Sequence, residues 1–286
     1  METFQSKDAI RDHVRSLKRQ GKSVGCVLTM GFLHDGHLAL VAEAKRHVDE
    51  VVTSIFVNPT QFGEKEDLDN YPTDIEGDLA KFEAAGVNAV FLPTPEEMYP
   101  EGAETVVTVP ALSDILQGKV RPGHFQGVTT VVSKLFHILE PDVTVFGQKD
   151  YQQLAIIRQM VRDLAMPIRV IGLPTVREED GLAMSSRNVR LTPEDRAASV
   201  VLSHALDLAE AHESDPLTTE EYRALVRETI AKEPRADIRA IDIRDAVTLA
   251  PFYGRLDRPA VILLSVRFGA ILLIDNRVIG PGKERL

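Results

Sequence analysis

The sequence contains one cysteine, Cys26, no long hydrophobic run and no excess of positive charge. A single cysteine cannot form an intramolecular disulfide, and the apolar residues 24–28 around it indicate a buried thiol, so we expect a cytoplasmic protein. Arg267 separates the two most apolar stretches, residues 260–266 and 268–274. Each stretch is far shorter than the roughly 18 residues that a membrane span needs. The N-terminus mixes charges from its second residue and resembles neither a signal peptide nor an anchor.

The charge balance argues against a broad surface for nucleic acid. Lys and Arg number 33 and Asp and Glu 43, which gives a formal net charge of -10. Such a protein is not expected to bind nucleic acid, although a local phosphate pocket is allowed. The chain has 286 residues, of which 44% are hydrophobic and 27% charged. It is therefore expected to be a soluble globular protein with one large domain or two modest ones.

Hydrophobic periodicity alternates between helix and strand over the first part of the chain. The pattern predicts helices over residues 7–19, 37–46, 74–85, 127–139 and 151–164. It predicts strands over residues 24–28, 51–57, 87–92, 143–146 and 168–171. This alternation predicts an α/β domain with a parallel, Rossmann-like sheet flanked by helices.

The alternation stops near residue 174, where we expect the boundary between two domains, residues 1–174 and 175–286. Beyond the boundary, the pattern predicts two charged helices, one beginning near Thr192 and one over residues 219–232. Three strands are predicted over residues 238–243, 260–266 and 270–274. A smaller α+β domain is the expected result.

The first candidate site is the segment of residues 29–37, between the first predicted strand and the next helix. Gly31 and Gly36 allow a ligand to approach the backbone, and the helix start offers N–H groups to an anion. His34 and His37 share one helical face and can donate hydrogen bonds to phosphate oxygens. A structural turn and a metal site are the alternatives, but the spacing suggests no third zinc ligand.

Carboxamide side chains follow later strands of the same predicted sheet. Asn58 and Gln61 come after the second strand, and Gln153 lies near the start of the helix that follows residues 143–146. Carboxamides both donate and accept hydrogen bonds, which suits a small hydroxy acid. The alternative is that Asn58 and, to a lesser degree, Gln61 are turn-forming residues around Pro59.

Two further segments carry groups suited to phosphate. Gly147-Gln148-Lys149-Asp150 offers a glycine for close approach, a lysine, and an acid that either holds a ribose hydroxyl or caps a helix. Met184-Ser185-Ser186-Arg187 offers two hydroxyls and a guanidinium that can clamp phosphates as a mobile lid. The alternative for the second segment is a solvated loop with an incidental arginine.

These motifs together resemble a known family. His34-Asp35-Gly36-His37 resembles the HIGH signature of the nucleotidyltransferase superfamily, and Met184-Ser185-Ser186-Arg187 resembles its KMSKS-type loop. With residues 56–62, 121–125, 147–151 and 174–178, the ordered set is similar to the pantothenate synthetases. That family ligates pantoate to β-alanine with ATP and Mg²⁺, through a pantoyl adenylate, and releases AMP and pyrophosphate.

The resemblance implies roles for individual residues. His34 and His37 stabilise phosphates, with His37 as a proton donor, and Lys149 and Arg187 act with them in catalysis. The residues implied in binding pantoate and β-alanine are Asn58, Gln61, Arg121 and Gln153. The residues implied in ATP binding are Met30, Gly31, Phe32, Leu33, His34, Asp35, Gly36, His37, Gly147, Gln148, Lys149, Asp150, Val176, Met184, Ser185, Ser186 and Arg187.

The resemblance also implies a lid formed by residues 175–286, a homodimer and no tightly bound organic cofactor. Asp78 is implied as a magnesium ligand, but the family often has two adjacent acids where this chain has Gly77-Asp78. Asp74, Glu76 and Asp78 otherwise fit the first turn of a helix, which favours acids. Leu28 replaces a usual proline and Gln148 a usual glutamate. The alternatives are a related nucleotidyltransferase that stops at an activated nucleotide, and a nucleotide-binding regulator without activity.

Overall fold

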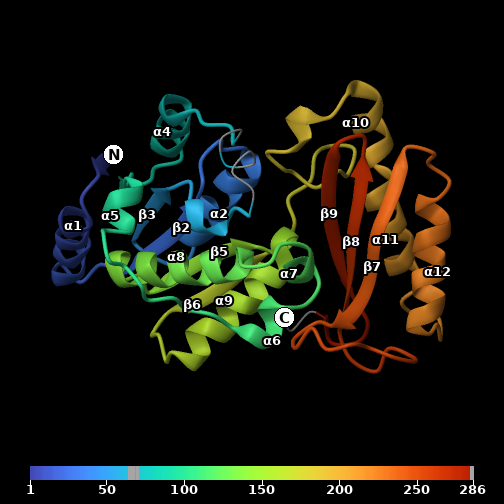
Figure 1. Ribbon diagram of the computed structural model, residues 1–286. Helices are drawn as coiled ribbons and strands as arrows, with labels where there is room; N and C mark the ends of the chain where they lie inside the picture. Colours follow the sequence, from blue (N-terminus) through green and yellow to red (C-terminus); the bar gives the residue numbers. More distant parts are fainter. Residues whose placement is uncertain (64–67, 69–70, 284–286) are drawn as a thin grey trace. The chain divides into compact units, whose positions relative to one another are not determined.

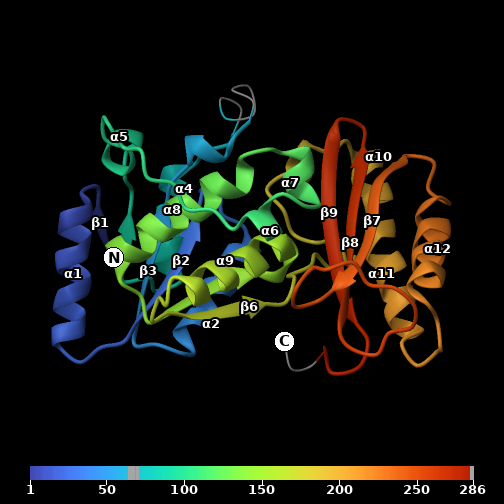
Figure 2. The same ribbon diagram turned by 60° about the horizontal axis from the view of Figure 1, so that its bottom comes forward.

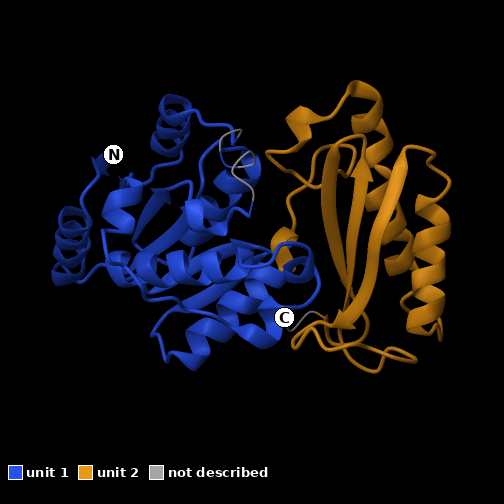
Figure 3. Cartoon of the chain, viewed as in Figure 1, with its two compact units in different colours: residues 1–148, 152–174 blue, residues 149–151, 175–286 orange. Residues whose placement is uncertain are grey.

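The computed structural model describes residues 1–63, 68 and 71–283. The chain divides into two compact units (Figure 3). Unit 1 comprises residues 1–148 and 152–174, and unit 2 comprises residues 149–151 and 175–286. Residues 149–151 therefore group with unit 2, although they lie on the N-terminal side of the expected boundary. Each unit is described by itself below.

Unit 1 contains a six-stranded sheet in the order β1-β4-β3-β2-β5-β6, and all its strand pairs are parallel. Figure 1 labels β2, β3, β5 and β6 of this sheet. Its strands are β1 (Glu2–Phe4), β2 (Val24–Thr29), β3 (Glu50–Ile55), β4 (Ala89–Phe91), β5 (Val143–Gly147) and β6 (Arg169–Leu173). Its longer helices are α1 (Lys7–Arg19), α2 (Asp35–Lys45), α4 (Ile75–Ala84), α8 (His124–Leu139) and α9 (Tyr151–Asp163). The prediction of a parallel α/β sheet is confirmed.

Helices cover both faces of this sheet (Figures 1 and 2). One core joins buried side chains of α1, α8 and α9 to the sheet, and a second joins those of α2 and α4 to its other face. On α1, Ile10, Val14 and Leu17 form the buried stripe that the helical period predicts. Cys26 of β2 is fully buried, and burial raises the pKa of its thiol to about 12. Its buried position is the one expected from the sequence.

The order of the strands places a topological switch between β2 and β5, because the chain runs from β2 toward β3 but returns to β5 on the other side. β2 pairs with β3 along its whole length, to Thr29 opposite Ile55. With β5 it pairs only at Gly25 opposite Val143 and at Cys26 opposite Thr144. The ladder between β2 and β5 thus stops before either strand ends. Open parallel sheets bind ligands at such a point, outside the carboxyl ends of the strands.

Unit 2 is a three-stranded antiparallel sheet packed against helices. The strands are β7 (Ala236–Asp245), β8 (Ala260–Phe268) and β9 (Ile271–Ile279), paired in chain order. The helices are α10 (Pro193–Ser199), α11 (Val201–Ala211) and α12 (Thr219–Ile230). Buried side chains of all six elements form one core. The predicted α+β character of this part of the chain is confirmed.

Several short elements were not expected from the sequence. β1 extends the sheet by pairing with β4, and three short helices lie between β4 and α8: α5 (Pro95–Met98), α6 (Pro110–Ser113) and α7 (Gln117–Val120). Elements of three or four residues are too short to show a period. Among the described residues, no helix combines the length and the hydrophobicity that crossing a membrane requires.

Candidate active site

Residues 30–37, which we call the histidine loop, comprise the connection from β2 to α2 and the first three residues of α2. Gly31 and Phe32 both have left-handed backbone conformations, with φ of +87° and +54°. The first suits glycine, whereas the second is unfavourable for a phenylalanine and needs support from its surroundings. Gly31 and Leu33 are buried, and Asp35 is exposed. The loop is therefore a tight turn directly beyond the carboxyl end of β2.

The two histidines of this loop cap the start of α2. His34 is the N-cap residue, and its Nδ1 accepts a hydrogen bond from the Gly36 N–H at 3.2 Å. The Nδ1 of His37 accepts a hydrogen bond from the His34 N–H at 3.3 Å. The ring centroids are 4.1 Å apart. Because Nδ1 accepts in both rings, each neutral imidazole carries its hydrogen on Nε2 and is a donor there.

Two side chains of helix α4 form hydrogen bonds with the backbone of the histidine loop. Asp78 is fully buried, and its two carboxylate oxygens accept hydrogen bonds from the N–H groups of Phe32 and Leu33, both at 2.7 Å. Lys81, one turn further along α4, donates from Nζ to the carbonyl oxygen of Leu33 at 2.8 Å. Three backbone groups of the loop are thus bonded to two side chains of one helix.

Gln61 and Asn58 lie on η1 (Pro59–Gln61) and at its N-cap, just beyond β3, and both are buried. The carboxamide of Asn58 donates to Gln61 Oε1 at 3.1 Å and to the Gly127 carbonyl at 3.2 Å. Its oxygen accepts from the hydroxyl of Tyr99 at 2.8 Å and from that of Thr60 at 3.0 Å. Asn58 is therefore enclosed by protein partners, which favours the turn-forming alternative and a role in orienting Gln61.

Gln61 also reaches the histidine loop, because its Nε2 contacts Met30 Sδ at 3.2 Å. The carbonyl of Gln61 is bonded to Nδ1 of His124 at 2.8 Å. A Cβ on Gly127 would lie 2.5 Å from the Thr60 carbonyl oxygen, so α8 can approach η1 this closely only with glycine at that position. His124 and Gly127 of α8 thus fix the backbone that carries Gln61.

Gln153 lies in the first turn of α9, which follows β5, and its side chain is half-buried. Its neighbour Gln152 is buried and is bonded to the carbonyl groups of Leu112 and Ile115, both at 2.8 Å. Gln153 is accordingly the glutamine of this pair that is open to solvent. Arg121 follows α7 and is half-buried. The substrate-binding roles of Gln153 and Arg121 stay predictions.

β5 ends at Gly147, and the chain continues directly as η2 (Gln148–Asp150). Gln148 belongs to unit 1, whereas Lys149 and Asp150 belong to unit 2. The backbone carbonyl of Lys149 accepts a hydrogen bond from Nδ2 of Asn276 at 2.9 Å, and the Tyr151 hydroxyl donates to the Ala246 carbonyl at 2.7 Å. These two bonds attach residues 149–151 to β9 and to the end of β7.

Residues 184–187, which we call the serine–arginine loop, follow a small hairpin in unit 2. Met184 N–H donates to the Val176 carbonyl at 3.0 Å, and Glu178 N–H donates to the Leu182 carbonyl at 2.8 Å. The hairpin brings Val176 beside Met184, and the resemblance implies both residues in ATP binding. Ser185 Oγ accepts from the Arg187 N–H at 3.2 Å. The Arg187 side chain is exposed.

A buried ion pair anchors the hairpin. Arg177 forms a two-pronged bond with Asp275, at 2.7 and 3.0 Å, and the Asp275 side chain is 1% exposed. Arg177 also donates to the Gly181 carbonyl at the tip of the hairpin. Asn188 ties the end of the serine–arginine loop to Glu178 at 2.8 Å. The sequence motif contains Arg177, but its role as an anchor depends on a partner 98 residues away.

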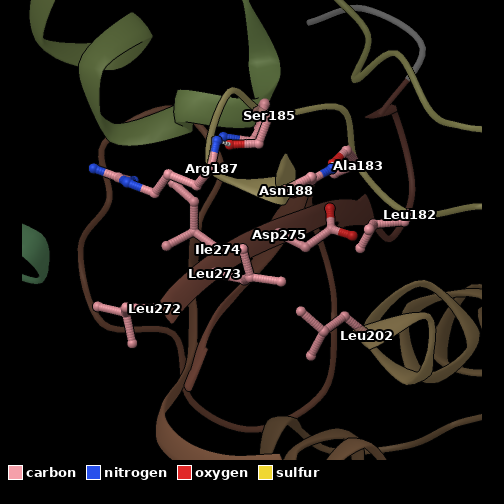
Figure 4. A pocket seen from close by; sticks show the side chains of 11 residues that line it. Leu182, Ala183, Ser185, Arg187, Asn188, Leu202, Leu272, Leu273, Ile274 and Asp275 are labelled. Atoms are coloured by element: carbon pink, nitrogen blue, oxygen red, sulfur yellow. Dashed lines mark hydrogen bonds between the residues drawn. The ribbon is translucent and has the colours of Figure 1, made fainter. Parts of the chain in front are cut away.

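Lys149, Ser185 and Arg187 line one small pocket of unit 2. Figure 4 shows Ser185 and Arg187 among the residues of this pocket. Leu272, Leu273 and Ile274 of β9, with Leu182 and Leu202, form the apolar part of its wall, and Asp275 also lines it. The pocket encloses about 10 Å³, the space of a single water molecule. A triphosphate does not fit inside it. Among the polar groups that line it, the cationic groups of Lys149 and Arg187 and the hydroxyl of Ser185 can donate to phosphate oxygens.

The surroundings of Asp78 bear on the magnesium role that the resemblance implies. Both oxygens of Asp78 are bonded to backbone N–H groups, and the Lys81 ammonium group is held at Leu33 nearby. In the part of the chain that the structure describes, no three His, Cys, Asp or Glu side chains are grouped to hold a metal ion. The geometry therefore favours a structural role for Asp78, as an acceptor for the histidine loop.

The structure thus brings the predicted residues together in two sets. In unit 1, the histidine loop, Asp78, Asn58 and Gln61 are linked by direct contacts. In unit 2, Lys149, Ser185 and Arg187 share a pocket. Sequence reasoning missed Lys81 and Tyr99, which act on these sets through long-range hydrogen bonds that leave no local pattern.

Comparison with known proteins identifies the family. The family model for pantoate-beta-alanine ligase matches residues 2–278. The chain is 52% identical over 278 residues to a pantothenate synthetase of Agrobacterium fabrum, covering 96% of this chain and 94% of the relative. It is 51% identical over 286 residues to that of Sinorhizobium medicae, covering 100% and 98%.

Solved structures agree with this result. Pantothenate synthetase from Thermus thermophilus superposes with a TM-score of 0.92 at 45% identity, covering 98% of this chain and 100% of that one. The pantoate-beta-alanine ligase from Francisella tularensis, complexed with beta-gamma ATP and beta-alanine, gives a TM-score of 0.79 at 33% identity, with 97% of each chain covered. The chain belongs to the pantoate-beta-alanine ligase family.

Proposed function

We infer that this protein condenses pantoate with β-alanine at the expense of ATP, which makes it a ligase that forms a carbon–nitrogen bond in pantothenate biosynthesis. Membership of the family over residues 2–278 carries this inference. A relative in the same family was solved with beta-gamma ATP and beta-alanine. The arrangement of His34 and His37, with Nδ1 accepting and Nε2 donating, supplies the groups that such a reaction needs.

In the first half-reaction, a carboxylate oxygen of pantoate attacks the α-phosphorus of ATP. A bond forms between these two atoms, the bond from the α-phosphorus to the bridging oxygen breaks, and pyrophosphate leaves. Negative charge builds up on the phosphate oxygens, where preorganised donors are most effective. We assign this role to the Nε2–H groups of His34 and His37, which donate hydrogen bonds to the phosphate oxygens, because the backbone already directs both rings through Nδ1.

Charge neutralisation is assigned to unit 2. Lys149 and Arg187 carry positive charge, and Ser185 and Ser186 carry hydroxyl donors, so together they suit the β- and γ-phosphates. Lys149 and Arg187 line the same pocket, and this supports the assignment. Met30 and Val176 are assigned to the adenosine site. Magnesium enters with ATP as part of the substrate complex, and we assign it no ligand from the protein.

In the second half-reaction, the amine of β-alanine attacks the acyl carbon of pantoyl adenylate. A carbon–nitrogen bond forms, the bond from carbon to the adenylate oxygen breaks, AMP leaves and the amine loses a proton. Gln61 is assigned to pantoate, because its carboxamide is oriented by Asn58 beside Met30. Gln153 and Arg121 are assigned to the same substrates on the resemblance alone. Unit 2 is proposed as the lid that keeps water from the adenylate.

We further propose a homodimer in the cytoplasm, with β6 as the contact. β6 is an edge strand, and its residues after Arg169 are half-buried. A hollow of about 470 Å³ lies beside it, lined by Arg158, Arg162 and Met166 among others. Two copies related by a twofold axis can pair their edge strands antiparallel. Val170→Lys should give a monomer by light scattering, and an unchanged mass would contradict this contact.

The function is tested by an assay in which each substrate is omitted in turn. ATP with pantoate alone should release about one pyrophosphate per site, without free AMP. Adding β-alanine should start continuous release of AMP and formation of the amide. Pyrophosphate release without amide formation would identify a nucleotidyltransferase that stops at the activated product, and no turnover at all would identify a nucleotide-binding regulator.

A further inference from the structure

The contact between α4 and the histidine loop has a geometry that points to a specific role. The left-handed conformations of Gly31 and Phe32 turn two consecutive N–H groups, those of Phe32 and Leu33, toward one acceptor. Successive backbone N–H groups of a turn that point at one acceptor form a concave anion site known as a nest. In this chain the anion is the carboxylate of Asp78, so the nest is filled by the protein itself.

The Asp78 carboxylate fits the nest formed by the N–H groups of Phe32 and Leu33. Asp78 is fully buried, and a buried carboxylate is stable only when its oxygens receive hydrogen bonds. A Cβ on Gly31 would lie 3.0 Å from its Oδ2, so the loop is packed directly against it. Phosphate cannot use these two N–H groups while Asp78 holds them.

Lys81 adds a second bond of opposite polarity. Its ammonium group donates to the carbonyl of Leu33, whose own N–H is bonded to Asp78. The peptide groups on both sides of Leu33 are therefore fixed from one helix. Leu33 directly precedes His34, whose N–H is in turn bonded to His37. The direction of both imidazoles thus depends on a chain of contacts that starts on α4.

We propose that Asp78 and Lys81 are positioning residues that hold the backbone of Phe32 and Leu33 and thereby aim the Nε2 atoms of His34 and His37, without a metal ion at Asp78. This proposal deepens the proposed function and rests on it for the role of the histidines. The geometry of the loop can nevertheless be tested without turnover. Displacement of a donor by about 1 Å is enough to lower a rate strongly.

The first experiment measures hydrogen exchange of the backbone amides by NMR in the ligand-free protein with a chelator present. The amides of Phe32 and Leu33 should be protected in the wild type, and Asp78→Asn should increase their exchange at least about tenfold, because one accepting oxygen becomes an amide donor. Glu76→Gln, an exposed acid of the same helix, is the matched control. Unprotected amides in the wild type, or protection that needs Mg²⁺, would overturn the proposal whether or not the protein is active.

The second experiment uses kinetics and does not depend on the folding of a variant at a buried site. Lys81→Met should lower kcat for pyrophosphate release about three- to tenfold with little change in the KM of ATP, and Lys81→Arg should restore most of the rate. Lys45→Met is the matched control, since Lys45 makes the same kind of bond, to the Ala85 carbonyl, away from the loop. If Lys81→Met and Lys45→Met lowered kcat equally, the bond from Lys81 to the Leu33 carbonyl would contribute only to general stability. That result would contradict the proposal.

Magnesium dependence separates positioning from metal binding. At fixed ATP, Asp78→Asn should lower kcat at saturating Mg²⁺ and leave the Mg²⁺ concentration for half-maximal rate unchanged. A metal ligand would show the reverse, with a raised Mg²⁺ requirement and a rate restored by excess metal. That outcome would overturn the proposal and leave the proposed function intact.

Discussion

The histidine loop of unit 1 and the serine–arginine loop of unit 2 are both assigned to ATP, but the protein holds them in different ways. The histidine loop is bonded through its backbone to Asp78 and Lys81, and its two rings are bonded to the start of α2. The serine–arginine loop is held mainly at its base, by Arg177 and Asn188, and its Arg187 side chain is exposed.

This difference in attachment suits the two loops to two different functions, stabilisation of a transition state and neutralisation of charge. Short side chains on a fixed backbone can donate to atoms at defined positions, which is what stabilising a transition state requires. Long cationic side chains on a loop anchored at its base can neutralise charge over a range of positions. We therefore expect changes in the histidine loop to act mainly on kcat, and changes in the serine–arginine loop to act mainly on ATP binding.

The largest effect is expected where the base of the serine–arginine loop is broken. Arg177→Met removes the partner of Asp275, whose side chain is 1% exposed, and leaves a buried carboxylate without its counter-charge. Loss of one member of a buried pair typically costs about 3–5 kcal/mol. The measurement is a denaturant unfolding curve. The double variant Arg177→Met with Asp275→Asn should recover part of the loss, and a single variant as stable as the wild type would show that the pair does not anchor the hairpin.

The next largest effect concerns the donor role of the histidine loop. His37→Ala should lower the rate of adenylation at least about tenfold, because a transition-state donor is lost. His37→Asn keeps a short acceptor that can still receive the His34 N–H but lacks a group at the position of Nε2. Stopped-flow pyrophosphate release should show a similar loss in both variants. A wild-type rate in the asparagine variant would mean that His37 serves only as a cap.

Lys149 provides the corresponding test in unit 2. Lys149→Ala should also lower adenylation at least about tenfold, since a positive charge near the triphosphate is removed. Arg187→Ala should act more on the KM of ATP than on kcat, because Arg187 is exposed and its position is less restricted. Steady-state kinetics with ATP varied at saturating pantoate separate the two parameters. Wild-type pyrophosphate release in the lysine variant would refute its assignment.

Periodicity and motif order predicted the parts of this molecule that depend on local sequence. The predicted helix over residues 7–19 matches α1, and the predicted strand over residues 51–57 overlaps β3, because burial on one stripe or on both faces leaves a regular pattern. β1 was missed, since its three residues acquire their structure only by pairing with β4. The α/β class was therefore predictable, but the edge of the sheet was not.

The candidate site was predictable to the same extent. Polar residues directly after strands, such as His34 and Gln61, could be found because parallel strands place their carboxyl ends at one edge. Tyr99 and Lys81 could not be found, because their partners are 41 and 48 residues away in the chain. Likewise, the grouping of Lys149 with unit 2 depends on its bond to Asn276, 127 residues further on.

The smallest expected effects compare a residue assigned to substrate with one that only orients it. Gln61→Ala should raise the KM of pantoate about tenfold and that of ATP much less, because a hydrogen-bonding partner of the hydroxy acid is lost. Tyr99→Phe removes only the hydroxyl that donates to Asn58, and Asn58 keeps its bond from Thr60. It should therefore raise the KM of pantoate only about two- to threefold. Initial rates with pantoate and ATP varied separately decide the matter. If Gln61→Ala raised the KM of pantoate and the KM of ATP equally, Gln61 would support the histidine loop through Met30 and would not be a pantoate ligand. If Tyr99→Phe raised the KM of pantoate as much as Gln61→Ala, the orientation of the carboxamide would matter as much as its presence.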